Sequence, residues 1–302
     1  MFSRLIAITS VLLLMSCSQL PTRTWELPPG AKAINVNGYD MAYVERGSGE
    51  PLVLVHGSLS DFRFFAAAME PLSSKYRVIS VSLRHYYPEP WNGKGGNFSL
   101  KQHASDVAAF LRGLNAGPVH LVGHSRGGSL ALYVATAHPE LVRTLAVAEG
   151  GASMSAFDES VSAPSAAGSI GKQRIANTLA LLEQGKIDEG LNYWIDNILS
   201  PGSWQVTPES ARQMFRDNAW SLKGADLDTF EPYSCADAGR IRAPKLLLKG
   251  EKTSAYFMKI VETMAGCMKN ADRAIVAGAA HGSPRQNPKG FAEAIVAFTS
   301  KH

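Results

Sequence analysis

Apolar residues along the chain form short continuous runs, separated by longer segments of helical pattern. The clearest runs are Pro51–Val55, Val119–Val122 and Val142–Ala148. A continuous apolar run bounded by turn residues is typical of a strand that is buried on both faces of a parallel sheet. Between these runs, apolar residues recur at helical spacing, as in the segment that Ser99 can cap and that runs to Leu114. The alternation predicts an α/β protein with a mostly parallel, doubly wound sheet.

The alternation of strands and helices is interrupted once. Residues 151–234 contain only helical patterns, including a helix that Thr207 can cap and that has Pro208 at its first position. Strand patterns then resume. We therefore predict an α/β core formed by residues 31–150 and 235–302, with residues 151–234 inserted as a helical cap.

The N-terminus has the pattern of an export signal. Arg4 precedes the apolar run Leu5–Met15, which is too short to span a bilayer because a spanning helix needs roughly 20 residues. A charged start, a short apolar stretch and small residues after it are typical of a secretory signal peptide. We assign residues 1–16 to this signal and the proline-containing segment 17–30 to a linker.

The end of this signal contains the sequence Leu14-Met15-Ser16-Cys17, which resembles a bacterial lipoprotein signal. That resemblance implies that Cys17 becomes the lipidated first residue of the mature chain. Ser18 resembles the residue that directs such proteins to the outer membrane. We therefore expect an exported protein with a lipid anchor in a bacterial outer membrane. The alternative is a plain secretory peptide that is cleaved nearby.

Composition and the remaining motifs add three expectations. Apolar residues make up 45% of the 302 residues and the net charge is +4 without a basic block, so nothing favours nucleic-acid binding. No zinc-ligand spacing or phosphate-binding loop occurs, so no cofactor is expected. In an oxidising compartment Cys235 and Cys267 could form a disulfide, and two separate buried thiols are the alternative.

The strongest chemical motif is Gly123-His124-Ser125-Arg126-Gly127, which follows a strand pattern and opens a helical one. Gly-x-Ser-x-Gly in this setting indicates a nucleophile elbow, a sharp turn that exposes a serine hydroxyl above the sheet. Glycines are needed because side chains at their positions would collide with neighbouring backbone. The turn also places the N–H groups of the helix start beside the reacting oxygen. Ser125 is therefore the candidate nucleophile.

A serine nucleophile needs a base, and His281 is the best placed of the eight histidines. It follows a late strand pattern in the loop Ala277–Gly282 and precedes the last helix. A histidine on a loop that a rigid sheet supports is a good candidate for a general base. His56 and His124 lie beside the predicted catalytic loops and are the nearest alternatives.

Four motifs occur in the order typical of one enzyme family: His56-Gly57, the Ser125 elbow, the strand Pro244–Gly250, and His281 ahead of Asn287-Pro288. Through these motifs residues 31–302 resemble the α/β-hydrolases. The resemblance implies that the backbone N–H groups of Ser58 and Arg126 form an oxyanion hole.

The third member of a catalytic triad departs from the family pattern. The usual aspartate position is occupied by Thr253. Some relatives take the acid from the end of the strand after the elbow, where this chain has Glu149, at 149 − 125 = 24 residues beyond Ser125. A carboxylate there lies on an adjacent strand and can orient His281. Glu149 is the preferred acid and Glu251 the alternative.

A serine at the elbow suits acyl transfer through an acyl-enzyme. The predicted cap contains aromatic residues that could form an apolar ceiling over the site or simply form the core of the cap: Tyr193, Trp194, Trp204, Phe215, Trp220 and Phe230. We therefore expect a hydrolase of moderately hydrophobic carboxylic esters, thioesters or lactones. The alternatives are C–C bond hydrolysis or haloperoxidase-like chemistry on the same triad, and a non-catalytic envelope lipoprotein that binds a ligand.

Overall fold

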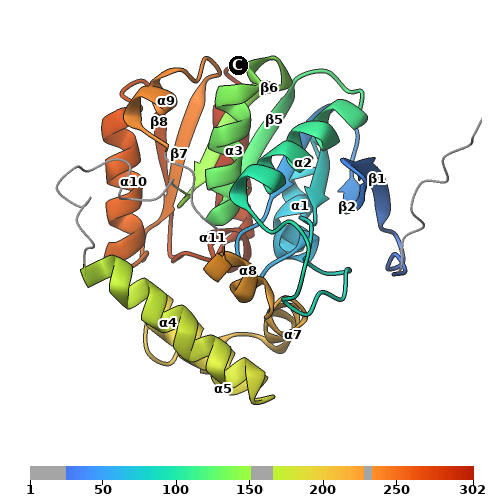
Figure 1. Cartoon of the computed structure of the whole chain (residues 1–302). Helices are drawn as coiled ribbons and strands as arrows, with labels where there is room; N and C mark the ends of the chain where they lie inside the picture. The colour runs from blue at the N-terminus through green and yellow to red at the C-terminus, as the bar shows by residue number, and fades with distance from the viewer. Residues whose placement is uncertain (1–24, 151–165, 228–232) are drawn as a thin grey trace, which may run out of the picture.

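An eight-stranded β-sheet in the spatial order β1-β2-β4-β3-β5-β6-β7-β8 runs through the centre of the molecule (Figure 1). Its strands are β1 (Lys32–Val36), β2 (Tyr39–Arg46), β3 (Glu50–Val55), β4 (Tyr76–Val81), β5 (Val119–His124), β6 (Val142–Ala148), β7 (Lys245–Gly250) and β8 (Asp272–Val276). Strands β3 to β8 pair in parallel, whereas β2 pairs antiparallel with both β1 and β4. The predicted fold class, a mostly parallel α/β sheet, is confirmed.

This computed structural model describes residues 25–150, 166–227 and 233–302. The predicted signal peptide, Cys17 and the first part of the linker lie outside the described residues. Two parts of the predicted cap, residues 151–165 and 228–232, also lie outside them, and the second includes Phe230. None of the helices in the described part of the chain is both long enough and apolar enough to cross a bilayer.

Helices cover both faces of the sheet, as the continuous apolar strands require. The covering segments are η1 (Phe62–Phe65), α1 (Ala66–Leu72), α2 (Leu100–Gly113), α3 (Arg126–Ala137), η2 (Pro139–Leu141), α9 (Cys235–Gly239), α10 (Ala255–Cys267), α11 (Ser283–Gln286) and α12 (Pro288–Thr299). Alternate residues of β3 face opposite layers: Leu52 and Leu54 pack with α1 and α12, whereas Val53 and Val55 pack with α2 and α3. Each such fully buried side chain stabilises the fold by about 1.5–3 kcal/mol.

Two predicted helix starts have different outcomes. The Ser99 hydroxyl accepts a backbone N–H of the first turn of α2, which confirms the predicted cap. The prediction for the later helix is wrong, because α7 begins at Glu209 and Pro208 is its uncapped flanking residue. Thr207 does not cap it, since its hydroxyl donates to the carbonyl oxygen of Ser203 in the preceding turn at 2.8 Å.

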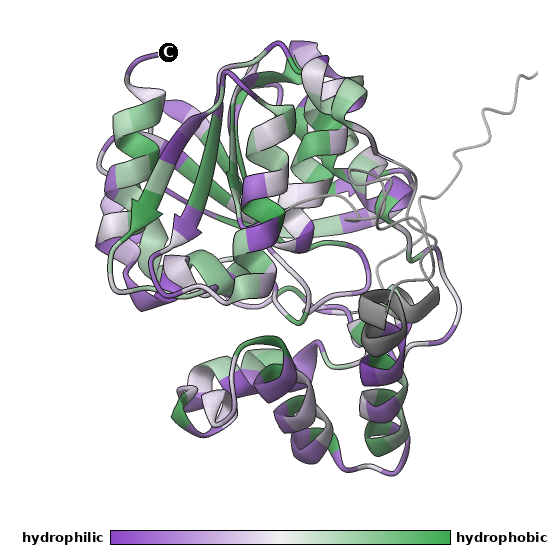
Figure 2. Cartoon of the chain, turned by 90° about the vertical axis from the view of Figure 1, so that its left-hand side faces the viewer, coloured by the Kyte–Doolittle hydropathy of each residue, from purple (hydrophilic) through white to green (hydrophobic). Residues whose placement is uncertain are grey.

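The inserted segment between β6 and β7 is helical in its described part and forms a layer of its own beneath the core (Figure 2). Its helices are α4 (Ala166–Glu183), α5 (Ile187–Ile198), α6 (Ser203–Val206), α7 (Glu209–Asp217) and α8 (Ser221–Leu227). One hydrophobic cluster holds the cap together, and its buried residues are Leu59, Leu179, Leu182, Leu191, Ile195, Trp204, Ala219 and Leu222. Leu59 belongs to the core sequence, so the cap and core share this cluster.

Helix α10 has no counterpart in the elements predicted from sequence. It packs against the sheet through Val261, Met264 and Ala265. Its last residue, Cys267, forms a disulfide with Cys235 at the start of α9, and the two Cα atoms lie 4.8 Å apart. The disulfide ties the segment that leaves the cap to the helix that follows β7.

Candidate active site

Ser125 lies on a sharp turn between β5 and α3. Its backbone has φ 53° and ψ −123°, a conformation that a residue with a side chain rarely adopts and that costs about 1–3 kcal/mol. Two hydrogen bonds fix the turn: the Ser125 N–H donates to the carbonyl oxygen of Ala148 at 2.9 Å, and the Gly128 N–H donates to that of Ser125 at 2.9 Å. The turn therefore has the geometry of a nucleophile elbow.

The two glycines of the motif make this turn possible. A Cβ atom on Gly123 would lie 2.3 Å from the carbonyl oxygen of Gly127, and one on Gly127 would lie 2.2 Å from that of Val55. Both distances are far below van der Waals contact, so any side chain would force the backbone apart. The spacing Gly-x-Ser-x-Gly is thus required by the close approach of β3, β5 and α3.

Glu149 follows β6 directly and also has a left-handed backbone, with φ 49°. It is 1% exposed. Its carboxylate accepts hydrogen bonds from the Gly250 N–H at 2.7 Å, from the Thr253 hydroxyl at 2.8 Å and from Nδ1 of His281 at 2.6 Å. A buried carboxylate is stable only when it is paired and hydrogen-bonded in this way. Thr253, at the usual acid position, here helps to hold the candidate acid at the end of the neighbouring strand.

The alternative acid has a different environment. The carboxylate of Glu251 is exposed and accepts a hydrogen bond from the Gly278 N–H at 2.7 Å. Of the two candidate acids, the structure brings Glu149 to the imidazole of His281.

Three contacts fix the ring of His281. Nδ1 donates to Glu149, as described above. The ring of Phe257 stacks on one face, with centroids 3.5 Å apart and planes at 9°. His124 lies 4.6 Å away from ring centre to ring centre, and its Nε2–H donates to the carbonyl oxygen of His281 at 2.7 Å. Sequence reasoning missed Phe257 because it missed α10, whose first turn carries this residue.

The two alternative bases are engaged elsewhere. Nε2 of His56 accepts the Leu83 N–H at 3.1 Å, so its Nδ1–H donates to the carbonyl oxygen of Gly57 at 2.8 Å. Burial lowers the pKa of His56 to about 4. Burial also lowers the pKa of His124 well below its usual value, and the nearby His281 adds to this effect. Both rings are therefore neutral and serve as hydrogen-bonding supports of the loops around Ser125.

The loop after β3 lies directly against the nucleophile. A Cβ atom on Gly57 would lie 2.9 Å from the Cβ atom of Ser125, so only glycine allows the loop this close. Ser58 comes next in this loop, and Arg126 is the first residue of α3. The Arg126 guanidinium packs over the ring of Phe98 at 5.0 Å. The backbone segments of both predicted oxyanion donors thus flank Ser125.

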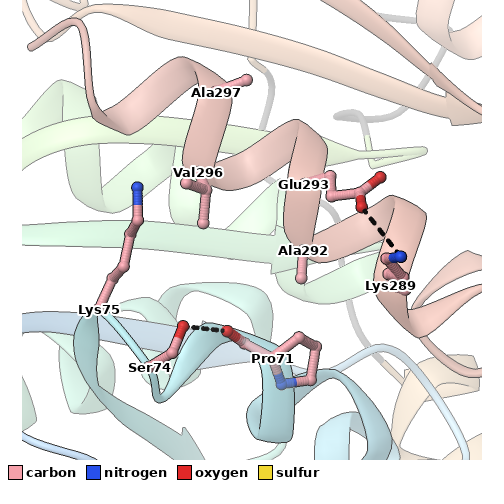
Figure 3. Close-up of a pocket in the computed structure, with 8 residues that line it drawn as sticks. All are labelled: Pro71, Ser74, Lys75, Lys289, Ala292, Glu293, Val296 and Ala297. Carbon is pink, nitrogen blue, oxygen red and sulfur yellow. Dashed lines mark hydrogen bonds and ion pairs between the residues drawn. The ribbon is translucent and has the colours of Figure 1, made fainter.

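A separate cavity of about 320 Å³ lies between α1 and α12 (Figure 3). Ser74 and Lys75 line it just before β4 begins, whereas Ser125 follows the end of β5, so this part of the cavity is at the opposite edge of the sheet. Among its charged lining residues, Lys289 and Glu293 pair with each other at 3.8 Å. It contains no groups arranged for catalysis. Within the described ranges, no cluster of His, Cys, Asp or Glu side chains could hold a metal ion.

Comparison with known proteins agrees with the geometry. A family model described as "Alpha/beta hydrolase family" matches residues 52–294. The (E)-2-((N-methylformamido)methylene)succinate hydrolase of Acinetobacter baylyi is 33% identical over 112 residues, which is 36% of this chain and 40% of that protein. A soluble epoxide hydrolase of a Corynebacterium species is 35% identical over 112 residues, or 36% and 38% of the two chains. The chain thus matches about two fifths of the length of these curated relatives.

Solved structures extend the likeness to nearly the whole fold. An esterase from Thermogutta terrifontis superposes with a TM-score of 0.69 over 90% of this chain and 97% of the esterase, at 20% sequence identity. This level of identity carries information on the fold alone. The elbow, the sheet order and the family match over residues 52–294 together show that the chain belongs to the α/β-hydrolase family.

Proposed function

We propose that the protein is a serine hydrolase that cleaves a moderately hydrophobic carboxylic ester or lactone. The observation that carries this proposal is the 2.6 Å hydrogen bond between His281 Nδ1 and the buried carboxylate of Glu149. Since Nδ1 donates to Glu149, Nε2 is the nitrogen that remains to accept the proton of Ser125. Serine, rather than aspartate, at the elbow favours acyl transfer over alkyl-enzyme chemistry.

In this mechanism the Ser125 hydroxyl attacks the acyl carbon while Nε2 of His281 takes its proton. Glu149 keeps the imidazole in the required tautomer and stabilises the imidazolium that forms. The backbone N–H groups of Ser58 and Arg126 stabilise the oxyanion of the tetrahedral intermediate. The imidazolium returns the proton to the leaving alkoxide, and water then hydrolyses the acyl-enzyme by the same steps. The products are a carboxylic acid and an alcohol, or a hydroxy acid from a lactone.

The expected substrate is moderately hydrophobic because the cap places apolar residues beyond the loop after β3. Trp204 is buried in the hydrophobic cluster of the cap, but Trp194, Phe215 and Trp220 pack against that cluster and are only partly buried. Partly exposed aromatic side chains on a cap favour an apolar acyl or alkoxy group over a highly charged metabolite.

We further propose that the protein is exported and anchored through a lipid on Cys17. The support is the signal-like sequence of residues 1–16. Cells that express the protein and are fed radioactive palmitate should label it, and Cys17→Ser should abolish the label. An unlabelled wild-type protein would contradict the anchor and favour plain secretion.

The nucleophile is tested with a fluorophosphonate probe, which reacts with activated serines. Wild-type protein should be labelled at Ser125, Ser125→Ala should not be labelled, and a panel of esters and lactones should be turned over only by the wild type. Absence of label on folded wild-type protein would instead favour a ligand-binding role. Label without turnover of any ester or lactone would favour C–C hydrolysis or haloperoxidase-like chemistry.

The acid is tested by paired amide substitutions. Glu149→Gln keeps the size of the side chain but cannot stabilise the imidazolium, so kcat should fall by about 10²–10⁴-fold. Glu251→Gln, the matched control, should retain kcat within about twofold, since surface substitutions are usually small in effect. Retained turnover in Glu149→Gln together with loss in Glu251→Gln would reverse the assignment.

A further inference from the structure

The segment that follows Gly57 is held by the cap as well as by the core. Leu59 has a left-handed backbone with φ 59°, although it carries a branched side chain. That side chain is 2% exposed and lies within the hydrophobic cluster of the cap, together with Leu191 and Trp204. A left-handed residue other than glycine persists only where its surroundings fix it. The cap supplies a large part of those surroundings.

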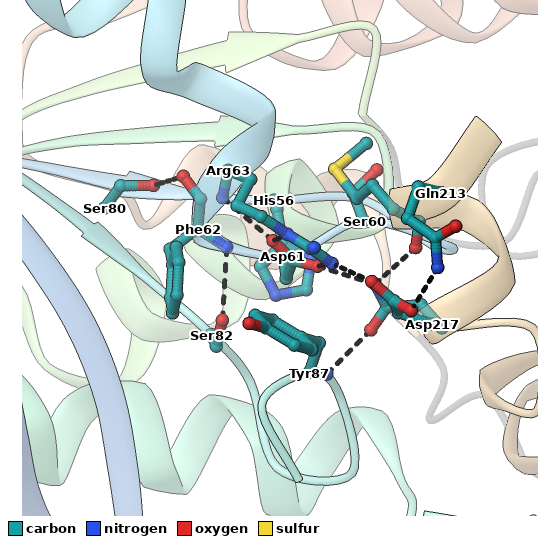
Figure 4. A network of polar contacts seen from close by, with 12 residues as sticks. His56, Ser60, Asp61, Phe62, Arg63, Ser80, Ser82, Tyr87, Gln213 and Asp217 are labelled. Carbon is teal, nitrogen blue, oxygen red and sulfur yellow. Dashed lines mark hydrogen bonds and ion pairs between the residues drawn. The ribbon is translucent and has the colours of Figure 1, made fainter. Parts of the chain in front are cut away.

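Asp61, two residues further, is fully buried and forms a second connection (Figure 4). Its carboxylate accepts the Arg63 N–H at 2.9 Å and the Arg63 guanidinium through Nε at 2.9 Å and a terminal nitrogen at 2.6 Å. It also accepts the side-chain amide of Asn218, in the cap, at 2.7 Å. Arg63 in turn pairs with Asp217 of the cap at 2.8 Å.

Asn218 joins three separate segments with one side chain. It is 2% exposed. Its Nδ2 donates to Asp61 and to the carbonyl oxygen of Met214 at 2.8 Å, and its Oδ1 accepts the Tyr87 N–H at 2.8 Å. Every polar atom of this buried amide is therefore used, and two of its partners belong to core loops.

Core residues other than Arg63 hydrogen-bond this loop near its two ends. On one side, Nδ1 of His56 donates to the carbonyl oxygen of Gly57. On the other side, the Phe62 N–H donates to the Ser82 hydroxyl at 3.1 Å, and the Ser80 hydroxyl donates to the carbonyl oxygen of Phe62 at 2.9 Å. Between these ends, the buried side chains of Leu59 and Asp61 both contact the cap.

From these contacts we infer that the cap sets the position of the oxyanion hole, with Leu59 and Asn218 acting as positioning residues for the Ser58 N–H. This inference rests on the proposed function, in which that N–H stabilises the oxyanion. Oxyanion donors act because they are aligned before charge develops. Loss of the Leu59 side chain or of the Asn218 amide lets the backbone at position 59 leave its left-handed conformation. This change moves the adjacent Ser58 away from the reacting oxygen. The triad itself stays in place because its hydrogen bonds involve other elements.

The test compares an oxygen ester with its thionoester, such as p-nitrophenyl butyrate and the C=S analogue. Sulfur is a weak hydrogen-bond acceptor, so thionoester turnover depends little on the oxyanion donors. In Leu59→Ala and in Asn218→Leu, kcat for the ester should fall by about 10- to 100-fold, somewhat less than the loss on deleting one donor. The ratio of ester kcat to thionoester kcat should fall as well. KM for the ester should stay within about threefold of the wild-type value, and the acid limb of the pH profile of ester turnover should be unchanged.

Two controls accompany these variants. Leu59→Met keeps an apolar side chain of similar volume and should restore turnover to near the wild-type value. Asp188→Asn removes an exposed ion pair of the cap, in which Arg216 Nε lies 2.6 Å from a carboxylate oxygen of Asp188. This variant should leave kcat for the ester and for the thionoester unchanged. Leu59→Ala gives the answer if Asn218→Leu does not fold.

The outcomes are distinguishable from failure of the proposed function. Equal loss on ester and thionoester, or unchanged kcat in folded Leu59→Ala and Asn218→Leu, overturns the positioning role while the hydrolase assignment stands. Wild-type protein that hydrolyses neither substrate and is not labelled at Ser125 overturns both.

Discussion

The hydrogen bond between Glu149 and His281 is the interaction on which the site depends. It joins the end of β6 to the loop after β8 at a distance of 2.6 Å. The sheet order explains how it forms, because β6 lies between the nucleophile strand β5 and β7. A carboxylate at the end of β6 is therefore one strand from Ser125, and the end of β7 supplies the Gly250 N–H and the Thr253 hydroxyl that hold it. Thr253, at the usual acid position, supports the proposed acid Glu149.

The same edge of the sheet concentrates backbone strain. Ser125, Glu149 and Leu59 all follow strand ends with positive φ, and none of them is glycine. Each such residue costs about 1–3 kcal/mol, which the buried strands and their hydrogen bonds offset. Glycines remove the remaining obstacles, since a side chain on Gly57 would collide with Ser125 and one on Gly127 would collide with the carbonyl oxygens of Val55 and His56. Strain and close packing thus bring the segments that follow β3, β5 and β6 within reach of one another.

Much of this arrangement could be predicted from sequence. The apolar runs indicate the sheet and the Gly-x-Ser-x-Gly spacing indicates the elbow, since each pattern involves residues that are close together in the sequence. The position of Glu149 at the end of the strand after the elbow favours it over Glu251, but the sequence alone leaves Glu251 open, because the contact with His281 depends on which carboxylate a distant loop reaches. Phe257 and Asn218 gave no local signal, since their roles arise from tertiary contacts between α10, the cap and the core. The prediction for the start of α7 is wrong because the Thr207 hydroxyl donates to the carbonyl oxygen of Ser203, in the preceding helix α6, and does not cap α7.

These contacts form two separate networks near Ser125: the hydrogen bonds of Glu149 with His281, Gly250 and Thr253, and the bonds that join the cap to the loop after β3. The central claim is that the carboxylate of Glu149 holds the Nδ1 proton of His281. Proton NMR of protein labelled with ¹⁵N-histidine measures this directly. We predict that the His281 Nδ1 proton resonates far downfield in the wild type and in Glu251→Gln, and that this resonance is lost in Glu149→Gln. A downfield His281 proton that survives in Glu149→Gln would contradict the account.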